Sequence, residues 1–276
     1  MCRWLAYSGT PVLLEELLYK PRHSLIDQSL NAKLGPHTTN GDGFGVGWYG
    51  ERGVPAIYKS VEPAWNDRNL RELAGQVRAG LVFAHIRSST GTPVQRSNCH
   101  PFRYGKWLWM HNGSITRFQD VKRDIMLAVD PSLYTSVEGS TDSEAFFFLA
   151  LTFALEHDPP AAVERAVGFI EQLGLKHGIE HPMQMTVATS DGQNLWAFRY
   201  SSEGSSRSLF YSTNVAALKA QYPNDLIFHG LSDETRLVVS EPLGTLAGVW
   251  NEVPESSYGV ICEGQDELKA FNPRVS

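Results

Sequence analysis

The order of the predicted secondary-structure elements constrains the fold of this chain most strongly. Short apolar runs rich in β-branched and aromatic residues are typical of strands, and Gly, Pro, Asn and Asp separate them. Two adjacent helical patterns, Ser143–Glu156 and Pro160 to Leu173, divide these strands into an earlier and a later group. Regular alternation of strand and helix, which builds a doubly wound parallel sheet, is missing. The order predicts an α+β fold with mainly antiparallel sheets and helices packed outside.

The predicted strands share a high content of aliphatic and aromatic residues. They are Arg3–Ser8, Gly43–Tyr49, Ala56–Ser60, Leu81–Arg87, Trp107–His111, Gln184–Thr189, Leu195–Tyr200, Leu209–Ser212, Leu237–Ser240 and Tyr258–Cys262. Shorter or weaker helical patterns cover Val12–Leu18, Asn66–Arg78 and Arg117–Leu127. Of the two stronger helices, the first follows residues that cap helix N-termini well, and Gly174 is expected to end the second.

Composition narrows the classes of function. The formal net charge is −6, and no basic tract interrupts the acidic balance, which excludes a general nucleic-acid binder. Apolar residues make up 42% of the chain, but no run of them approaches the length of a membrane span. The N-terminus lacks the pattern of a secretory signal, which favours a cytoplasmic location.

The cysteines and the length add further expectations. Three widely spaced cysteines without a CxxC motif predict neither a disulfide framework nor a structural zinc site. We therefore expect no metal and no cofactor. The 276 residues contain no long polar linker or internal repeat, and we treat residues 1–276 as a single domain.

Cys2 is the first residue along the chain that suggests a catalytic function. Removal of Met1 would leave a cysteine that carries a thiol and a free α-amino group. The pKa of an α-amino group is about 7.7–8.0, so this amine can take the thiol proton near neutral pH. The alternative is a small apolar residue that enters the first strand, since cysteine is commonly buried.

Two strand ends carry residues suited to bind anions. Arg87 follows an apolar strand, and its guanidinium matches a carboxylate with two hydrogen bonds, although an arginine there can also be a solvated strand end. Asn112 and Gly113 follow another strand, where Asn-Gly is typical of a hairpin turn. Alternatively, the Asn112 amide and a neighbouring backbone N–H form an oxyanion hole.

The segment Thr141-Asp142-Ser143-Glu144 precedes the first strong helix. In the simplest interpretation Thr141 or Asp142 caps the helix and Glu144 is favoured by the helix dipole. An acidic residue here can also hold an ammonium group.

In order along the chain, these segments resemble the class II glutamine amidotransferases, a branch of the N-terminal-nucleophile (Ntn) hydrolases. The segments that carry the resemblance are Met1-Cys2, Asn40-Gly41-Asp42-Gly43-Phe44-Gly45, His85-Ile86-Arg87 with Thr90, Asn98-Cys99-His100-Pro101, His111-Asn112-Gly113, Thr141-Asp142-Ser143-Glu144 and, in the later part, Arg236–Pro242. The opening Met-Cys-Arg is similar to stand-alone bacterial members such as the ergothioneine-pathway γ-glutamyl amidohydrolase. The resemblance implies a four-layer αββα sandwich with two mainly antiparallel sheets.

The resemblance also implies roles for individual residues. Cys2 would attack the γ-carbonyl of glutamine or of a γ-glutamyl amide and form a γ-glutamyl thioester, with its own α-amino group as base. Asn112 and Gly113 would hold the oxyanion. The substrate α-carboxylate would bind to Arg87 and Thr90. Asp142 would bind its α-ammonium group.

The chain departs from the synthase-linked members of this family at two places. Those members commonly carry Trp and His where this chain has Ser88 and Gly91. A chain of 276 residues also leaves no room for the large ammonia-receiving domain of those enzymes. A stand-alone hydrolase of γ-glutamyl amides is therefore favoured over a glutaminase subunit that supplies ammonia to a separate enzyme. The leaving amine, the pathway and self-association stay open.

A third alternative is a non-catalytic module that binds γ-glutamyl compounds, which applies if Met1 stays attached to Cys2.

Other motifs in the sequence give weaker evidence of function. Gly45–Gly50 matches GxGxxG, but a turn rather than a helix follows it, which argues against a dinucleotide site. His85 and His111 are interpreted as hydrogen-bonded structural histidines, and Cys99 as structural.

Overall fold

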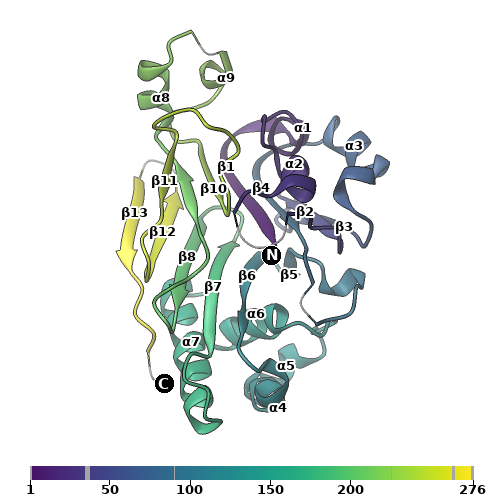
Figure 1. Ribbon diagram of the computed structural model, residues 1–276, viewed down its shortest axis with the longest axis vertical. Helices are drawn as coiled ribbons and strands as arrows, with labels where there is room; N and C mark the ends of the chain where they lie inside the picture. The colour runs from purple at the N-terminus through teal and green to yellow at the C-terminus, as the bar shows by residue number, and fades with distance from the viewer. Residues whose placement is uncertain (1, 35–37, 90, 225, 263–264, 275–276) are drawn as a thin grey trace.

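The computed structural model describes residues 2–34, 38–89, 91–224, 226–262 and 265–274. Figure 1 shows two sheets that face each other, with helices on their outer sides. The strands are β1 (Arg3–Leu13), β2 (Phe44–Trp48), β3 (Ala56–Ser60), β4 (Arg78–Ile86), β5 (Phe102–Tyr104), β6 (Trp107–Ile115), β7 (Met183–Ser190), β8 (Leu195–Ser201), β9 (Phe210–Ser212), β10 (Arg236–Val239), β11 (Trp250–Glu252), β12 (Ser257–Cys262) and β13 (Gln265–Ala270). The helices are α1 (Leu14–Leu18), α2 (Leu25–Asn31), α3 (Arg68–Ala74), α4 (Phe118–Ala128), α5 (Pro131–Tyr134), α6 (Asp142–Thr152), α7 (Pro159–Lys176), α8 (Val215–Gln221) and α9 (Leu226–His229).

The first sheet has the strand order β11-β9-β10-β1-β4-β2-β3. Its central strand β1 pairs antiparallel with β4 on one side and with β10 on the other. The start of β1 lies beside the end of β4, since Arg3 is opposite Ile86. The segments that follow β4 and β10 therefore both reach the N-terminal end of β1.

The second sheet has the order β13-β12-β8-β7-β6-β5, and its recorded pairings are also antiparallel. Strand β6 pairs with β7 along its whole length, with Asn112 opposite Thr186 and Gly113 opposite Met185. The Asn-Gly pair therefore lies inside a strand and not in a hairpin turn.

Three hydrophobic clusters define four layers. One fills the space between α1–α3 and the first sheet, and another lies between α4, α6 and α7 and the second sheet. The third lies between the two sheets and contains Trp4 and Phe83 from one side and Leu108 and Met110 from the other. The expected αββα sandwich with two antiparallel sheets is confirmed.

Strand alternation decides which residues face the space between the sheets. Side chains alternate between the two faces of a strand. Trp4 and Ala6 of β1 face the other sheet, and Met110 of β6 faces back toward them. By the same alternation Cys2 and Asn112 belong to these inner faces, on opposite sheets.

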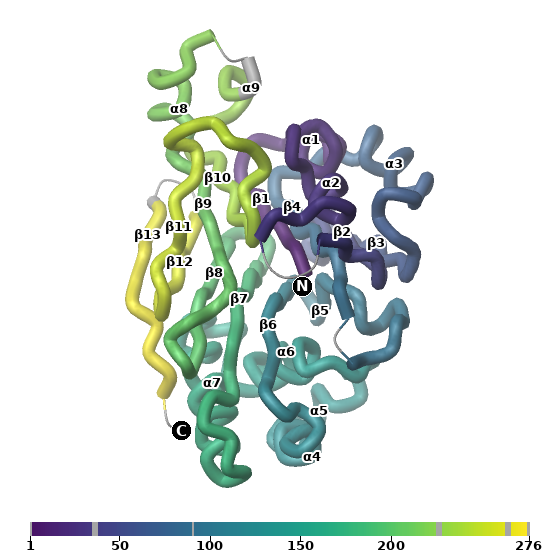
Figure 2. Tube along the Cα trace, in the orientation of Figure 1, coloured from purple at the N-terminus to yellow at the C-terminus, as the bar shows by residue number. Residues whose placement is uncertain are grey.

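The predicted strands are all present, whereas several short elements were not predicted. The unpredicted elements are β5, β11, β13, α2, α5, α8 and α9. Most of them have few residues, so they carry little periodicity. Helices α8 and α9 pack around a small cluster of their own that includes Val215 and Phe228, and Figure 2 shows them at the end of the molecule away from α4.

The ends of two short predicted helices differ from those in the structure. The predicted helix Val12–Leu18 begins only at Leu14, because Val12 and Leu13 continue β1 after a bulge and pair with β4. The predicted helix Asn66–Arg78 is α3 alone, since Gly75 caps it and Arg78 already begins β4.

The two long helices also differ in length from the prediction. Helix α6 ends at Thr152 rather than Glu156, with Phe153 as its C-cap. Helix α7 continues past Gly174 to Lys176. A Cβ at Gly174 would lie 2.7 Å from the Pro182 ring, so this glycine serves a close contact rather than a helix end.

Within the described part of the chain, no helix has the length and apolar character needed to cross a membrane.

Candidate active site

Cys2 lies at the end of β1, against the segment that follows β4. Its sulfur accepts a hydrogen bond from the Ser88 N–H at 3.4 Å and lies 3.5 Å from the Ser88 carbonyl oxygen. Two side chains donate to its carbonyl oxygen at 3.0 Å each, Arg3 from the same strand and Asn112 from the opposite sheet. Both sheets therefore hold Cys2 in place.

Asn112 projects from β6 into the space between the sheets, where it is 5% exposed. Its amide nitrogen bonds to the Cys2 carbonyl, and this recorded bond uses one of its two N–H donors. The structure brings this predicted site residue directly to Cys2.

Gly113 follows Asn112 on β6 and lies opposite Met185 of β7. A Cβ at this position would lie 1.9 Å from the Gln184 carbonyl oxygen and 2.7 Å from the His111 ring. Its φ of +157° is also unfavourable for other residues. Only glycine fits here, and the backbone beside Asn112 is therefore free of a side chain.

Arg87 is 3% exposed and is not a solvated strand end. Its guanidinium donates to the hydroxyl groups of Ser89 and Thr92, at 3.1 and 2.7 Å, and to the Pro93 carbonyl at 3.2 Å. It also reaches the Asp42 carbonyl at 3.3 Å. In this structure the arginine organises the loop that begins beside the Cys2 sulfur.

Asp142 links the start of α6 to the end of β6. Its carboxylate accepts from the Ile115 N–H at 2.9 Å and from the Ser143 N–H at 2.8 Å. The helix cap itself is Thr141, whose hydroxyl accepts from the Glu144 N–H. Asp142 thus bonds to Ile115, which lies two residues beyond the oxyanion-hole candidate Gly113 on β6. Thr90, the other predicted substrate-binding residue, lies outside the described residues.

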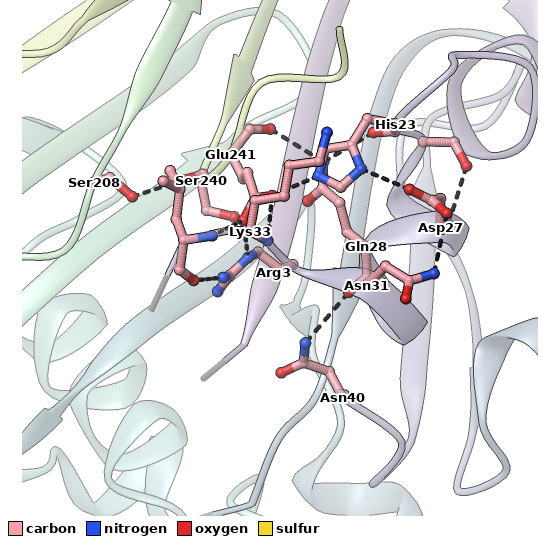
Figure 3. Close-up of polar contacts among 12 residues, drawn as sticks. Arg3, His23, Asp27, Gln28, Asn31, Lys33, Asn40, Ser208, Ser240 and Glu241 are labelled. Atoms are coloured by element: carbon pink, nitrogen blue, oxygen red, sulfur yellow. Dashed lines mark hydrogen bonds and ion pairs between the residues drawn. The ribbon is translucent and has the colours of Figure 1, made fainter. Parts of the chain in front are cut away.

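Figure 3 shows a buried polar network that runs from Arg3 to α2. The carboxylate of Glu241 pairs with Arg3 at 2.8 Å and with His23, and it accepts from the N–H groups of Lys33 and Leu34. His23 bonds to Asp27 with its other ring nitrogen. Glu241 thereby fixes the arginine that holds the Cys2 carbonyl.

The electrostatics of the site keep the thiol protonated at rest. Burial raises the pKa of the Cys2 thiol, and the Ser88 N–H and the charges of Arg87 and Arg3 oppose this effect without cancelling it. Reaction at neutral pH therefore requires a base. Burial outweighs the charge of Asp142 and lowers the pKa of His111, so this imidazole is neutral.

His111 is hydrogen-bonded to the Ser143 hydroxyl at 2.8 Å, as expected for a structural histidine. The ring of His85 stacks on that of His100, with 4.2 Å between the ring centroids. Burial lowers the pKa of His85 to about 3, although a hydrogen bond with the His111 backbone acts in the opposite direction, so this imidazole is neutral.

Three contributors to the Cys2 environment were not predicted from the sequence: Arg3, Ser88 and Glu241. Arg3 and Glu241 belong to the Met-Cys-Arg and Arg236–Pro242 segments that carry the family resemblance. Membership of these segments was the sequence signal that could have indicated their importance. Because 238 residues separate Arg3 from Glu241, no local sequence pattern predicts that they pair. Among the described residues, no cluster of three or more His, Cys, Asp or Glu side chains could hold a metal ion.

Comparisons with known proteins agree with this geometry. A family model described as "Glutamine amidotransferases class-II" matches residues 24–273. The "Probable glutamine amidotransferase DUG3" of Saccharomyces cerevisiae is 33% identical over 95% of this chain and 82% of its own length. A "Gamma-glutamyl-hercynylcysteine sulfoxide hydrolase" of Mycolicibacterium smegmatis is 36% identical over 42% of this chain and 52% of its own.

Solved structures give the same result. A glutamine aminotransferase class-II domain protein from Silicibacter pomeroyi is 35% identical, with a TM-score of 0.76 over 99% of this chain and 100% of that chain. The glutamine phosphoribosylpyrophosphate amidotransferase of B. subtilis is 13% identical, with a TM-score of 0.65 over 99% of this chain and 50% of that chain, and this likeness shows the fold. The ordered motifs, the layered fold and the family match lead to one conclusion: this chain belongs to the class II glutamine amidotransferases.

Proposed function

We propose that this enzyme hydrolyses the γ-amide bond of glutamine or of a γ-glutamyl amide, with Cys2 as an N-terminal nucleophile. The observation that carries the proposal is the meeting of Cys2 and Asn112 across the two sheets, 3.0 Å from the Cys2 carbonyl oxygen to the Asn112 amide nitrogen. The contact supports the proposal, because the proposed oxyanion donor Asn112 lies against the residue whose thiol would become N-terminal when Met1 is removed. The hydrolase name of the mycobacterial relative supports the same chemistry.

The reaction has two steps. The α-amino group of processed Cys2 takes the thiol proton, and the sulfur bonds to the γ-carbon while Asn112 and the Gly113 N–H stabilise the oxyanion. The C–N bond then breaks, and the α-ammonium group returns its proton to the leaving amine. Water attacks the thioester in the second step, which releases glutamate and restores the thiol.

The head group of the substrate needs one cationic and one anionic anchor. Arg87 is the proposed anchor for the α-carboxylate, which would replace some of the loop oxygens that the guanidinium now contacts, and Thr90 is proposed to assist it. Asp142 is the proposed anchor for the α-ammonium group. The substrate is a small molecule, the catalytic unit is proposed to be one domain of residues 1–276, and a reducing cytoplasm suits its thiol.

The test is labelling with 6-diazo-5-oxo-L-norleucine, a glutamine mimic that alkylates such thiols, followed by intact-mass and peptide mass spectrometry. We expect a chain without Met1 that gains one adduct at Cys2. The variant Cys2→Ser should gain none and lose hydrolysis of γ-glutamyl amides. Cys262→Ser, which changes a cysteine on β12, is the matched control and should label like the wild type.

Two outcomes would overturn the proposal. One is an adduct on a residue other than Cys2. The other is hydrolysis that persists in Cys2→Ser at the wild-type rate. A chain that retains Met1 in its native host would favour the binding-module alternative.

A further inference from the structure

A polar pocket lies at the edge of the sandwich, where the edge strands β3 and β5 meet the start of α6. Its volume is about 460 Å³, within the range of small-molecule sites. Its described lining includes none of the residues proposed to bind or cleave the substrate. Five charged side chains line it: Lys59, Arg96, Arg103, Glu138 and Glu144.

Lys59 extends from the first sheet to the second. It lies opposite Gly45 of β2, and its side chain passes over this glycine, where a Cβ would be 3.1 Å from the Lys59 Cγ. The ammonium nitrogen ends 4.9 Å from the centroid of the Phe102 ring on β5. The amine is therefore presented to the pocket at the place where the two sheets meet.

The Lys59 ammonium group has no recorded hydrogen bond or ion pair within the described part of the chain, although the side chain is half-buried. Burial lowers the pKa of Lys59 to about 8, and Glu144 and Glu138 act in the opposite direction. Taking an ammonium group out of water is costly unless an anion completes it. The pocket therefore has a position for an anionic group beside Lys59.

The two carboxylates of the pocket come from the α6 side. Glu144 accepts from the N–H groups of Glu138 and Gly139, at 3.0 and 2.6 Å, which fix its position. Glu138 is exposed, and among the described residues its carboxylate has no recorded partner. The cations come from other elements, such as β3 for Lys59 and the turn Arg96–Asn98. The pocket thus offers positive and negative charge from different elements.

The charges of the pocket define the class of ligand. Three cationic and two anionic side chains leave an excess of one positive charge. A complementary ligand carries both signs of charge and one excess negative charge. An acidic α-amino acid, with two carboxylates and one ammonium group, has this pattern.

Asn98 connects the pocket to the loop that Arg87 organises. It belongs to the same turn as Arg96, and its amide donates to the Pro93 carbonyl at 2.9 Å and to the Ser140 hydroxyl at 3.2 Å. Arg87 donates to the same Pro93 carbonyl at 3.2 Å. A ligand that binds Arg96 would therefore act on the loop of the proposed carboxylate anchor.

We propose that this pocket is a regulatory site for an acidic α-amino acid, whose carboxylates bind Lys59 and Arg96 and whose ammonium group binds Glu138. L-Glutamate is the acidic amino acid that the reaction releases, and this identification rests on the proposed function. Through Asn98 the bound product would disturb Arg87 and slow the enzyme.

Isothermal titration calorimetry with L-glutamate tests the site in enzyme whose Cys2 carries the norleucine label, because the label occupies the proposed active site. We expect one glutamate per chain. Glutarate, which lacks only the ammonium group, should bind at least about tenfold more weakly. Lys59→Met should weaken glutamate binding by about 10- to 100-fold, the usual effect of losing a charged hydrogen-bonded pair, and Lys59→Arg should recover part of the loss.

Lys122→Met is the matched control, because Lys122 on α4 also lies over a phenylalanine ring, 5.8 Å from the centroid of Phe118. It should bind glutamate like the wild type. Glu138→Gln changes an exposed side chain and should weaken binding as well, so the test does not depend on the folding of Lys59→Met.

Steady-state kinetics of the unlabelled enzyme test the regulation. Glutamate should inhibit the wild type with a competitive component and a second component that substrate does not relieve. Lys59→Met should keep the first component and lose the second. Purely competitive inhibition of the wild type would contradict a regulatory role.

Two binding results would overturn the site itself. One is a labelled enzyme that binds no glutamate, and the other is equal affinity in the wild type, Lys59→Met and Glu138→Gln. Equal affinity for glutarate would overturn the assignment to an amino acid. Failure of the proposed function is distinct, since Cys2→Ser would then retain hydrolysis, while titration of the unlabelled chain would still measure how glutamate binding depends on Lys59.

Discussion

Asn112 has the most demanding position in the site, because one side chain must serve two purposes. It holds the Cys2 carbonyl in the resting enzyme and is proposed to stabilise the oxyanion during catalysis. Its amide has two N–H donors, so both tasks are compatible. The lack of a side chain at Gly113 adds a backbone N–H on the same strand.

Asn112→Ala should lower kcat by roughly 10²- to 10³-fold, the effect of removing one oxyanion donor. KM should change much less, because Arg87 and Asp142 are the residues proposed to bind the head group. Steady-state kinetics with a γ-glutamyl amide measure both values. Asn69→Ala, on the exposed side of α3, is the control. A loss below tenfold would remove Asn112 from the oxyanion hole.

Helix α6 and strand β6 act as a pair in this enzyme. The start of α6 carries Asp142, which bonds to the Ile115 N–H at the end of β6. Glu144, two residues further, accepts from the N–H groups of Glu138 and Gly139 in the preceding loop. The helix terminus thereby sets the distance between the proposed ammonium anchor and the oxyanion hole.

Thr141→Ala should lower the free energy of unfolding by about 1 kcal/mol, because the variant loses the side-chain cap on the Glu144 N–H. Thr141→Ser keeps the hydroxyl and should stay close to the wild type. Urea denaturation of the three proteins measures the difference. If alanine and serine destabilise equally, the hydroxyl of Thr141 is not the stabilising group.

The space between the sheets holds the molecule together and shields its histidines from water. His85 and His100 stack there, and burial lowers the pKa of both rings. An unfolded histidine has a pKa of about 6.5, whereas that of His85 is about 3 in the folded chain. Below pH 6.5 the unfolded chain therefore takes up a proton that the folded chain refuses, and stability falls as the pH falls toward 3.

His85→Phe should reduce this acid sensitivity. Between pH 6 and pH 4 the wild type should lose about 1.4 kcal/mol per pH unit more than the variant, which corresponds to one proton. Denaturant unfolding at several pH values measures the two slopes. Identical slopes would show that His85 takes up its proton in the folded chain as readily as in the unfolded chain.

Much of the molecule could be predicted because its signals are local. The strands follow from runs of β-branched and aromatic residues, and the start of α6 from its capping residues. The order of these elements excluded a doubly wound sheet. The ends of elements were less predictable, as Gly174 shows: its close contact with Pro182 lies outside any local pattern.

Residue types and their order along the chain were sufficient for the class of fold, the family and the candidate residues Cys2, Arg87, Asn112 and Asp142. The folded chain alone showed that Glu241 holds Arg3. It also showed that the rings of His85 and His100 stack on each other. Capping and strand propensity act over a few neighbouring residues, whereas burial and ion pairing depend on which distant segments the sheets bring side by side.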